Sequence, residues 1–150
     1  MIRLRPFTEG DVEILRQGQG QGMSPEEIRA MIAEWNAGTY RGKPFEMYAV
    51  EADGAVAGHI SLLGQSRSIA SVGVEILPEE RRKGYAAGAV EQLLALAAQR
   101  GCRVIQNQVA ADNVPGIALH EKLGFETGGY VYRNARGREV LIYVKCLSLS

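Results

Sequence analysis

The chain has 150 residues, of which 46% are hydrophobic and 23% are charged, a balance typical of one globular domain with a sizeable core. Its 17 basic and 17 acidic side chains leave no excess positive charge for a phosphate backbone, which excludes nucleic acid as an expected partner. No apolar run approaches the roughly 20 residues of a membrane-spanning helix, and the charged N-terminus lacks the apolar core of a signal peptide. We therefore expect a single domain over residues 1–150, cytoplasmic and without a membrane partner.

The first third of the chain is predicted to contain one strand and two helices. Alternating apolar and basic residues in Ile2–Phe7 indicate a short strand, and a helix is expected near Asp11–Gln17. The glycine-rich segment Gly18–Gly22 ends this helix. A second helix begins with the capping-box pattern at Ser24 and stops at Gly38.

The middle of the chain is predicted to be an antiparallel meander of three strands. Phe45–Gly64 contains two strand-like runs joined at Asp53 and Gly54, a dipeptide that tolerates the positive φ angles of tight hairpins. Ile69–Leu77 forms the next strand after a polar turn. Short connections of this kind join neighbouring antiparallel strands.

The last part of the chain alternates helices and strands. An amphipathic helix is expected from Gly84 to Gly101, followed by a strand over Cys102–Ala110 and a shorter helix over Asn113–Lys122. Two final strands flank a turn at Asn134–Arg138. The order β-α-α-β-β-β-α-β-α-β-β predicts an α/β protein of the α+β kind.

The cysteines and histidines give no indication of a metal site or a disulfide. Cys102 and Cys146 lie in strand-like apolar runs, which predicts two buried, reduced thiols. His59 and His120 are far apart in the chain and show no metal-ligand spacing.

A cationic loop, Pro78–Lys83, joins the strand at Val72–Leu77 to the helix that begins at Gly84. The unpaired N–H groups and positive dipole end of a helix start suit a phosphate or diphosphate, and Gly84 lets the anion approach because it has no side chain. Three consecutive cations close the loop: Arg81, Arg82 and Lys83. The alternative is an ordinary solvated loop, because short patterns of this kind also arise by chance.

Two motifs resemble the GCN5-related N-acetyltransferases, the GNAT superfamily. Arg81, Gly84 and Ala86 match its acetyl-coenzyme A signature R/Q-x-x-G-x-G/A. Downstream, NVPGIALHEKLGF at Asn113–Phe125 is similar to the second motif of the family, and the order of elements agrees along nearly the whole chain.

This resemblance implies a mixed, mostly antiparallel sheet flanked by helices and splayed between the fourth and fifth strands, with acetyl-coenzyme A in the opening. The backbone of Ile76 and Leu77 would pair with the pantetheine arm, the amides of Arg82–Ala87 would hold the diphosphate, and Asn113 would bond the pantetheine from the other side. The cofactor-binding residues implied are Ile76, Leu77, Arg81, Arg82, Lys83, Gly84, Tyr85, Ala86, Ala87 and Asn113.

The expected reaction is direct attack of a primary amine on the acetyl thioester, and it needs a base because free alkylamines are protonated at pH 7. Glu75, on the strand before the cofactor loop, is the candidate, acting directly or through water. A solvent-exposed structural role is the alternative for Glu75, and Glu46 and Glu51 are possible substitutes. A backbone N–H near Ile76 is the donor that the family implies for the oxyanion.

His120 stands where many members of the family carry a tyrosine that acts as general acid. An imidazole is partly protonated near neutral pH and can donate a proton to the leaving sulfur, so His120 is the candidate acid. Its alternative role is packing on the edge of a short helix.

The acceptor is expected to be a small molecule, an amino acid or a peptide N-terminus. Gly18–Gly22, Trp35, Tyr40 and the final hairpin with Tyr130 and Tyr132 are candidates for shaping its site, which their aromatics predict to be moderately apolar without a strong charge preference.

Two other functions stay open, a non-catalytic acyl-coenzyme A sensor and a phosphate site for another nucleotide. An exposed strand edge near the C-terminus also allows a homodimer.

Overall fold

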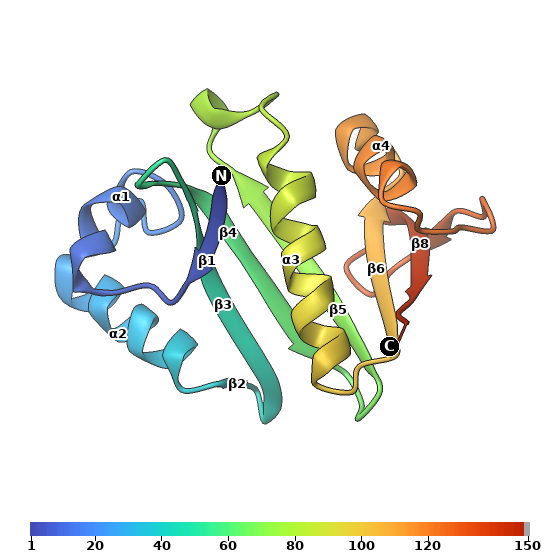
Figure 1. Ribbon diagram of the computed structural model, residues 1–150, viewed down its shortest axis with the longest axis horizontal. Helices are drawn as coiled ribbons and strands as arrows, with labels where there is room; N and C mark the ends of the chain where they lie inside the picture. The colour runs from blue at the N-terminus through green and yellow to red at the C-terminus, as the bar shows by residue number, and fades with distance from the viewer. Residues whose placement is uncertain (149–150) are drawn as a thin grey trace.

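The computed structural model describes residues 1–148, and over these residues the chain forms one eight-stranded sheet with helices against both faces (Figure 1). The sheet order is β1-β3-β4-β5-β6-β8-β7, with the short β2 paired to β3. The strands are β1 (Ile2–Arg5), β2 (Thr39–Tyr40), β3 (Lys43–Ala52), β4 (Ala55–Gly64), β5 (Ile69–Ile76), β6 (Val104–Ala110), β7 (Tyr132–Arg133) and β8 (Glu139–Cys146).

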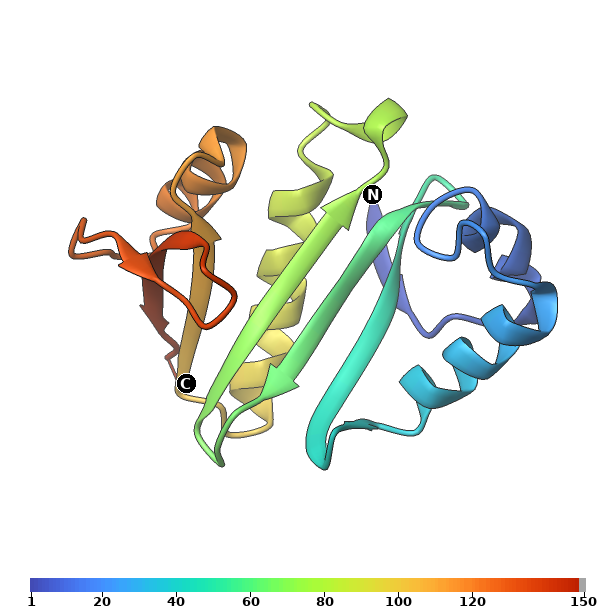
Figure 2. The same ribbon diagram turned by 180° about the vertical axis from the view of Figure 1, so that it is seen from behind.

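The helices divide between the two faces of this sheet. Figure 1 shows α3 lying along one face, and Figure 2 shows β3, β4 and β5 from the other side, with α1 and α2 beyond β3. The helices are α1 (Val12–Arg16), α2 (Pro25–Asn36), α3 (Tyr85–Gln99) and α4 (Val114–Lys122), and two short 3₁₀ helices are η1 (Glu9–Asp11) and η2 (Pro78–Glu80).

Alternation along the strands gives each face its own core. Val50, Ile60 and Ile76 point toward α3, where Leu93 and the rest of the larger apolar cluster are buried. Met47 and Ala49 point the other way and are covered by Phe7 and by Ile28 and Ile32 of α2. The odd-numbered residues of β5, including Glu75, therefore face the side of the sheet that carries α1 and α2.

The expected turns and caps are present. Asp53 and Gly54 have φ angles of 52° and 83° in the hairpin between β3 and β4. Ser24 accepts a 3.1 Å hydrogen bond from the Glu27 N–H, and the Glu27 carboxylate accepts from the Ser24 N–H at 2.9 Å, which completes the capping box of α2. The short strand β2 was not predicted.

The sheet opens between β5 and β6. These parallel strands pair only at Ile69 with Val104 and at Ala70 with Ile105, after which they separate. The opening is the predicted splay between the fourth and fifth expected strands, with the numbering shifted by one because of β2. The sequence-based prediction of a mixed, mostly antiparallel sheet flanked by helices is confirmed.

The cysteines are free, but the prediction of burial was wrong for one of them. Cys102 is half-buried and Cys146, the last residue of β8, is exposed. Strand-like composition does not distinguish a residue inside a strand from one at its end. None of the helices in residues 1–148 is long and apolar enough to cross a lipid bilayer.

The N-terminal segment is tied to the sheet by a buried carboxylate, Asp11. Both of its oxygens accept hydrogen bonds of 2.9 Å from Arg5, and it also accepts a 2.8 Å bond from the Thr8 N–H. The Arg5 guanidinium is the main cause that lowers the pKa of Asp11 below its usual range.

We expect Asp11→Asn to lower the free energy of unfolding by about 2 kcal/mol at pH 7, because it removes charge-assisted hydrogen bonds. The folded-state pKa of Asp11 lies below the unfolded value of about 3.9, so this stabilisation is complete above that value and disappears as the pH falls through the lowered pKa. Urea unfolding of the parent and of Asp11→Asn from pH 7 to pH 2 measures this stabilisation. A difference in unfolding free energy between the two proteins that stays constant down to pH 2 would contradict the stabilising role of the ionised Asp11 carboxylate.

Candidate functional site

The cationic loop and the start of α3 have the geometry of an anion-binding turn. Gly84 is the N-cap of α3 in a left-handed conformation with a φ of 79°, and no side chain caps the helix. A Cβ on Gly84 would meet no heavy atom within 4 Å, so the space in front of the helix start is open. The first-turn N–H groups of this 15-residue helix are available to a ligand.

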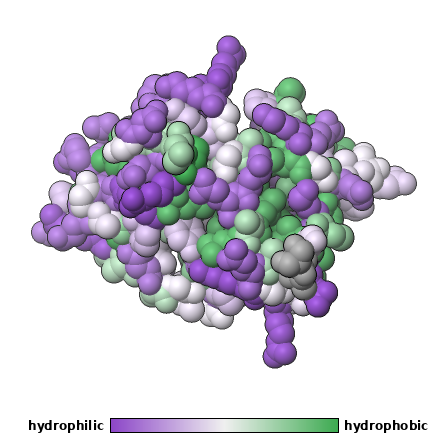
Figure 3. Space-filling view, viewed as in Figure 1, coloured by the Kyte–Doolittle hydropathy of each residue, from purple (hydrophilic) through white to green (hydrophobic). Residues whose placement is uncertain are grey.

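The helix start faces a groove of about 720 Å³ between the end of β5, α3 and α4. Figure 3 shows hydrophobic surface over and beside α3 toward α4. The groove brings together most of the cofactor-binding residues predicted from two separate motifs: Ile76, Arg81, Arg82, Gly84, Tyr85, Ala86, Ala87 and Asn113. Apolar walls with a cationic, amide-lined end suit a long ligand that carries a diphosphate.

Three of the predicted cofactor-binding residues make contacts within the protein that differ from the predicted contacts with the cofactor. The Leu77 N–H donates to the Ala57 carbonyl at 2.8 Å, and its side chain lines another cavity. Lys83 Nζ is 3.0 Å from a Glu80 carboxylate oxygen, outside the lining of the groove. The Ile76 carbonyl accepts a 2.9 Å hydrogen bond from Arg81 Nε. The pairing of Ile76 and Leu77 with a pantetheine arm therefore stays a prediction.

Asn113 has the structural role considered for it, and its cofactor-binding role stays a prediction. Its Oδ1 accepts a 3.1 Å hydrogen bond from the Gly116 N–H and caps α4, as the structural interpretation predicted. The residue also lines the groove, as the cofactor-binding role requires.

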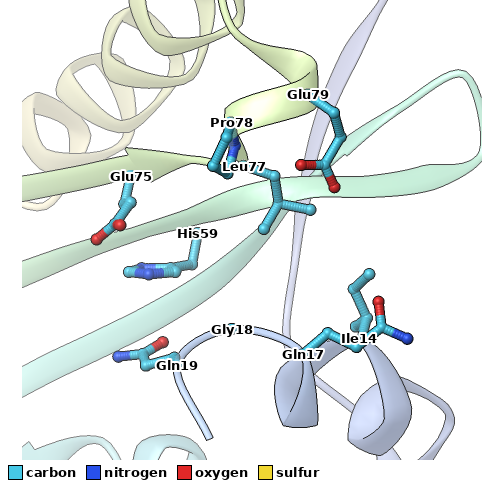
Figure 4. A pocket seen from close by; sticks show the side chains of 9 residues that line it. All are labelled: Ile14, Gln17, Gly18, Gln19, His59, Glu75, Leu77, Pro78 and Glu79. Atoms are coloured by element: carbon cyan, nitrogen blue, oxygen red, sulfur yellow. The ribbon is translucent and has the colours of Figure 1, made fainter. Parts of the chain in front are cut away.

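A second cavity of about 460 Å³ lies on the opposite side of β5, against α1 and the glycine-rich segment (Figure 4). It is lined by Ile14, Gln17, Gly18, Gln19, His59, Glu75, Leu77, Pro78 and Glu79. Glu75 lines both this cavity and the groove, so the two spaces lie next to each other at this residue. Two carboxylates, Glu75 and Glu79, make this cavity attractive to a cation, whereas the sequence predicted an acceptor site without a strong charge preference.

A third hollow of about 500 Å³ continues along the same face of the sheet and shares Gln19 with the second cavity. Trp35 and Tyr40, two of the candidates for shaping the acceptor site, line it together with Phe45. The exposed Tyr130 and Tyr132 are not among its lining residues.

His59 is the site residue that sequence reasoning missed. It lies on β4 directly opposite Glu75 on β5 in the antiparallel register. Burial lowers the pKa of His59 below its ordinary value of about 6.5, and the Glu75 charge opposes this shift. The sequence signal that could have found His59 was the predicted antiparallel meander, because the pairing of two strands determines which residues face each other.

His120 lies within a chain of hydrogen bonds at the base of the splay. The Val72 N–H donates to Asn107 Oδ1 at 2.8 Å, which leaves the Asn107 amide nitrogen to donate to His120 Nε2 at 3.0 Å. His120 Nδ1 then carries the ring proton and donates to the Gly116 carbonyl at 2.8 Å. Both ring nitrogens are thus occupied, and His120 is not among the lining residues of the groove. This arrangement argues against the general-acid role expected for His120.

Replacement of His120 separates the two roles. We expect His120→Phe to lower the free energy of unfolding by about 2 kcal/mol, because the buried Asn107 amide loses its acceptor. His120→Gln retains an acceptor and should recover most of this loss, with kcat within about tenfold of the parent in both variants. A kcat loss of about 10²-fold or more in both variants, without a matching loss of stability, would restore the general-acid role.

The two substitute bases considered for Glu75 lie elsewhere. The Glu46 carboxylate is bonded to Arg100 and to the Tyr48 hydroxyl, on the side of the sheet that carries α3. The Glu51 carboxylate accepts a 2.7 Å hydrogen bond from Arg5 Nε. Neither residue is among those that line the groove or the second cavity.

Sequence comparison places these features in a known family. The model of the acetyltransferase (GNAT) family matches residues 12–125, which includes both predicted motifs and both strands of the splay. An aminoglycoside N(6')-acetyltransferase type 1 from Acinetobacter baumannii is 43% identical over 61 residues, covering 40% of this chain and 42% of that protein. The chain therefore matches less than half the length of this relative.

Solved structures share the fold over nearly the whole chain. A ribosomal L7/L12 alpha-N-protein acetyltransferase in complex with coenzyme A superposes with a TM-score of 0.84 at 20% identity, covering 99% of this chain and 96% of that one. A spermidine N-acetyltransferase from Vibrio cholerae in complex with coenzyme A and spermine gives 0.79 at 19% identity, covering 97% and 95%.

The match to the family model covers most of the chain, and the splayed sheet, the left-handed glycine before α3 and the groove beside it agree with that match. The chain belongs to the GNAT family of acetyltransferases.

Proposed function

We propose that this protein is an acetyl-coenzyme A-dependent N-acetyltransferase that acts on a primary amine. The observation that carries the proposal is the position of Glu75, which lines the groove on one side of β5 and the second cavity on the other. A donor in the groove and an amine in the cavity would meet at this residue. Acetyl-coenzyme A, when bound, supplies the activated thioester carbonyl.

Different residues of the groove bind different parts of the cofactor. The first-turn amides of α3, with Arg82 beside them, hold the diphosphate, because they offer unpaired donors and positive charge at the left-handed Gly84. The Asn113 amide donates to the pantetheine arm from α4. The apolar walls between α3 and α4 exclude water from the arm.

The second cavity selects the acceptor by charge. Glu75 and Glu79 attract an ammonium group, while Leu77 and Ile14 offer apolar contacts to the carbon atoms next to it. The acceptor class is therefore a small amine or a peptide N-terminus whose reacting nitrogen is cationic in solution. Three known relatives act on acceptors of this kind, an aminoglycoside, spermidine and a protein N-terminus.

Calorimetric titration tests whether the protein binds acetyl-coenzyme A. We expect acetyl-coenzyme A to bind with a dissociation constant in the micromolar range or tighter and coenzyme A to compete with it. ATP should bind at least about 100-fold more weakly, because it lacks the pantetheine arm that fills the apolar groove. Equal affinity for ATP and acetyl-coenzyme A would contradict the groove assignment and favour a general nucleotide site.

Measurement of thiol release tests whether the protein transfers the acetyl group to an amine. The probes are a 6'-amino aminoglycoside, spermidine and a peptide that begins with serine, each with its N-acetylated form as the matched control. Release that requires the free amine supports the transferase. Tight cofactor binding with no release for any amine of a wider panel would support the sensor alternative instead.

A homodimer through the β7 edge of the sheet stays a prediction. β7 is two residues long and pairs on one side with β8. Light scattering at two concentrations measures the mass, and a monomer mass at both would contradict it.

A further inference from the structure

We propose that His59 is the group that takes the proton from the acceptor ammonium, and that Glu75 holds the ammonium and the His59 ring in position. This inference rests on the proposed transferase function and adds a catalytic residue to it. It replaces the carboxylate-only route that the sequence suggested for Glu75.

The pairing of β4 with β5 places His59 next to Glu75. β4 and β5 run antiparallel with His59 opposite Glu75, and the register continues through Ile60 with Val74 and Ser61 with Gly73. Directly opposite residues on one face have Cβ atoms about 5 Å apart. Figure 4 shows the His59 ring and the Glu75 carboxylate in one cavity, with the Gln19 amide on the other side of the ring.

The surroundings of His59 favour a neutral ring that can be protonated briefly. Burial lowers the pKa of His59, so at neutral pH the imidazole keeps a free lone pair. The Glu75 charge acts in the opposite direction and stabilises the imidazolium once it forms. The neighbour on β3 is the uncharged Ala49, and of the described residues that line the cavity only Glu75 and Glu79 carry a charge at neutral pH.

An imidazole suits this step better than a carboxylate. An alkylammonium has a pKa near 10.4, whereas carboxylates as a class lie near 4.3 and imidazole near 6.5, so proton transfer to imidazole is in general the less unfavourable of the two. Burial lowers the pKa of His59 and reduces this advantage, while the Glu75 charge opposes the reduction. A general base is most effective when its pKa lies close to the working pH. A carboxylate beside the ring contributes most by binding the ammonium and orienting the imidazole, as it does in other acid–base pairs.

The proton balance of the reaction is complete with these groups. The ammonium gives one proton to His59, and the neutral amine then forms the C–N bond as the C–S bond of the thioester breaks. The remaining excess proton on nitrogen is transferred to the thiolate, and His59 returns its proton to water. The products are the amide, the thiol and one proton in solution.

The first experiment compares the pH dependence of kcat/KM in the parent protein and in His59→Gln. In the parent we expect a plateau from neutral pH toward the pKa of the amine, and a fall on the acid side as His59 becomes protonated. In His59→Gln we expect kcat at pH 7 to fall about 10²- to 10⁴-fold. The plateau should be replaced by a rise of about tenfold per pH unit, because only amine that is already neutral can react.

Glu75→Gln is the comparison variant. With Glu75 as a positioning residue, this variant should raise the KM of the amine about tenfold or more while the acid limb shifts to lower pH, since His59 loses the charge that raises its pKa. With Glu75 as the base, Glu75→Gln would lose the plateau and His59→Gln would keep it. That second pattern would overturn the proposal.

A spectroscopic readout does not depend on activity. The chain has two histidines, so ¹⁵N NMR titration of the ring nitrogens, assigned with His59→Gln, follows His59 directly. We expect a pKa below the ordinary imidazole value in the parent and a further decrease in Glu75→Gln. A kinetic acid limb that does not coincide with the His59 titration would overturn the proposal.

The outcomes also separate this inference from the proposed function. If the parent protein binds acetyl-coenzyme A but acetylates no amine, the proposed transferase function is wrong. If the parent protein acetylates amines and His59→Gln retains its rate and its acid limb, only the proposed role of His59 is wrong. Acetyl-coenzyme A affinity should be unchanged in the variant, which confirms its fold, and His59→Asn is the second choice if His59→Gln does not fold.

Discussion

Replacement of Gly84 by glutamate should weaken acetyl-coenzyme A binding by at least about 100-fold. Gly84 has a φ of 79°, and any L side chain costs about 1–2 kcal/mol in this left-handed conformation. The new carboxylate would also stand where the first-turn amides of α3 hold the diphosphate, and like charges repel. The strain lowers the stability of the free and the bound protein alike, so the weaker binding comes from this repulsion and from the lost N–H bonds to the diphosphate. A loss of about 3 kcal/mol from these causes corresponds to roughly 100-fold in the dissociation constant, which calorimetry measures.

Gly42→Glu is the matched control. Gly42, in the turn between β2 and β3, has a φ of 78°, and a Cβ there would meet no heavy atom within 4 Å. Both variants therefore introduce the same charge and the same backbone strain, but Gly42 does not precede a long helix. Gly42→Glu should bind acetyl-coenzyme A as the parent does. Equal weakening in both variants would show that strain, and not the anion site, causes the loss.

Most of the fold was accessible from the sequence because its signals are local. The alternation of Phe45–Gly64, the Asp53–Gly54 turn and the apolar spacing of α3 each depend on residues close together in the chain. The anion-binding turn was predictable for the same reason, since strand, cationic loop and glycine are contiguous. Family resemblance then supplied the splay between β5 and β6, which no local pattern indicates.

The chemistry of the site depends on contacts that no local pattern contains. His59 and Glu75 meet because two strands pair in one register, and a shift of one residue would move every side chain of β4 to the other face. His120 was assigned from its position in a motif, yet its ring is occupied by Asn107, a residue of another strand. Position in a motif places a residue in the fold, whereas its hydrogen-bond partners determine what it can do.

The close approach of β4 to β5 beside this pair requires a glycine, Gly58, and its replacement by alanine should destabilise the protein by about 3 kcal/mol. Gly58 is buried between β3 and β5, opposite Val50 and Ile76. An added Cβ would lie 2.2 Å from the Glu75 carbonyl oxygen and 2.8 Å from Ile76 Cα, both backbone atoms that cannot rotate away. The strands must separate locally, which is costly in a packed core.

Gly64→Ala on the same strand is the control for this variant. The three heavy atoms nearest to its Cβ would be side-chain atoms of Pro44, at 3.3–3.4 Å, so a small adjustment accommodates it and we expect a loss below about 1 kcal/mol. Urea unfolding compares the two. Because Glu75 and Ile76 line the groove, Gly58→Ala should also reduce amine transfer under conditions in which the variant is still folded. If Gly58→Ala is as stable and as active as Gly64→Ala, the close approach of β4 to β5 does not hold Glu75 in place beside His59.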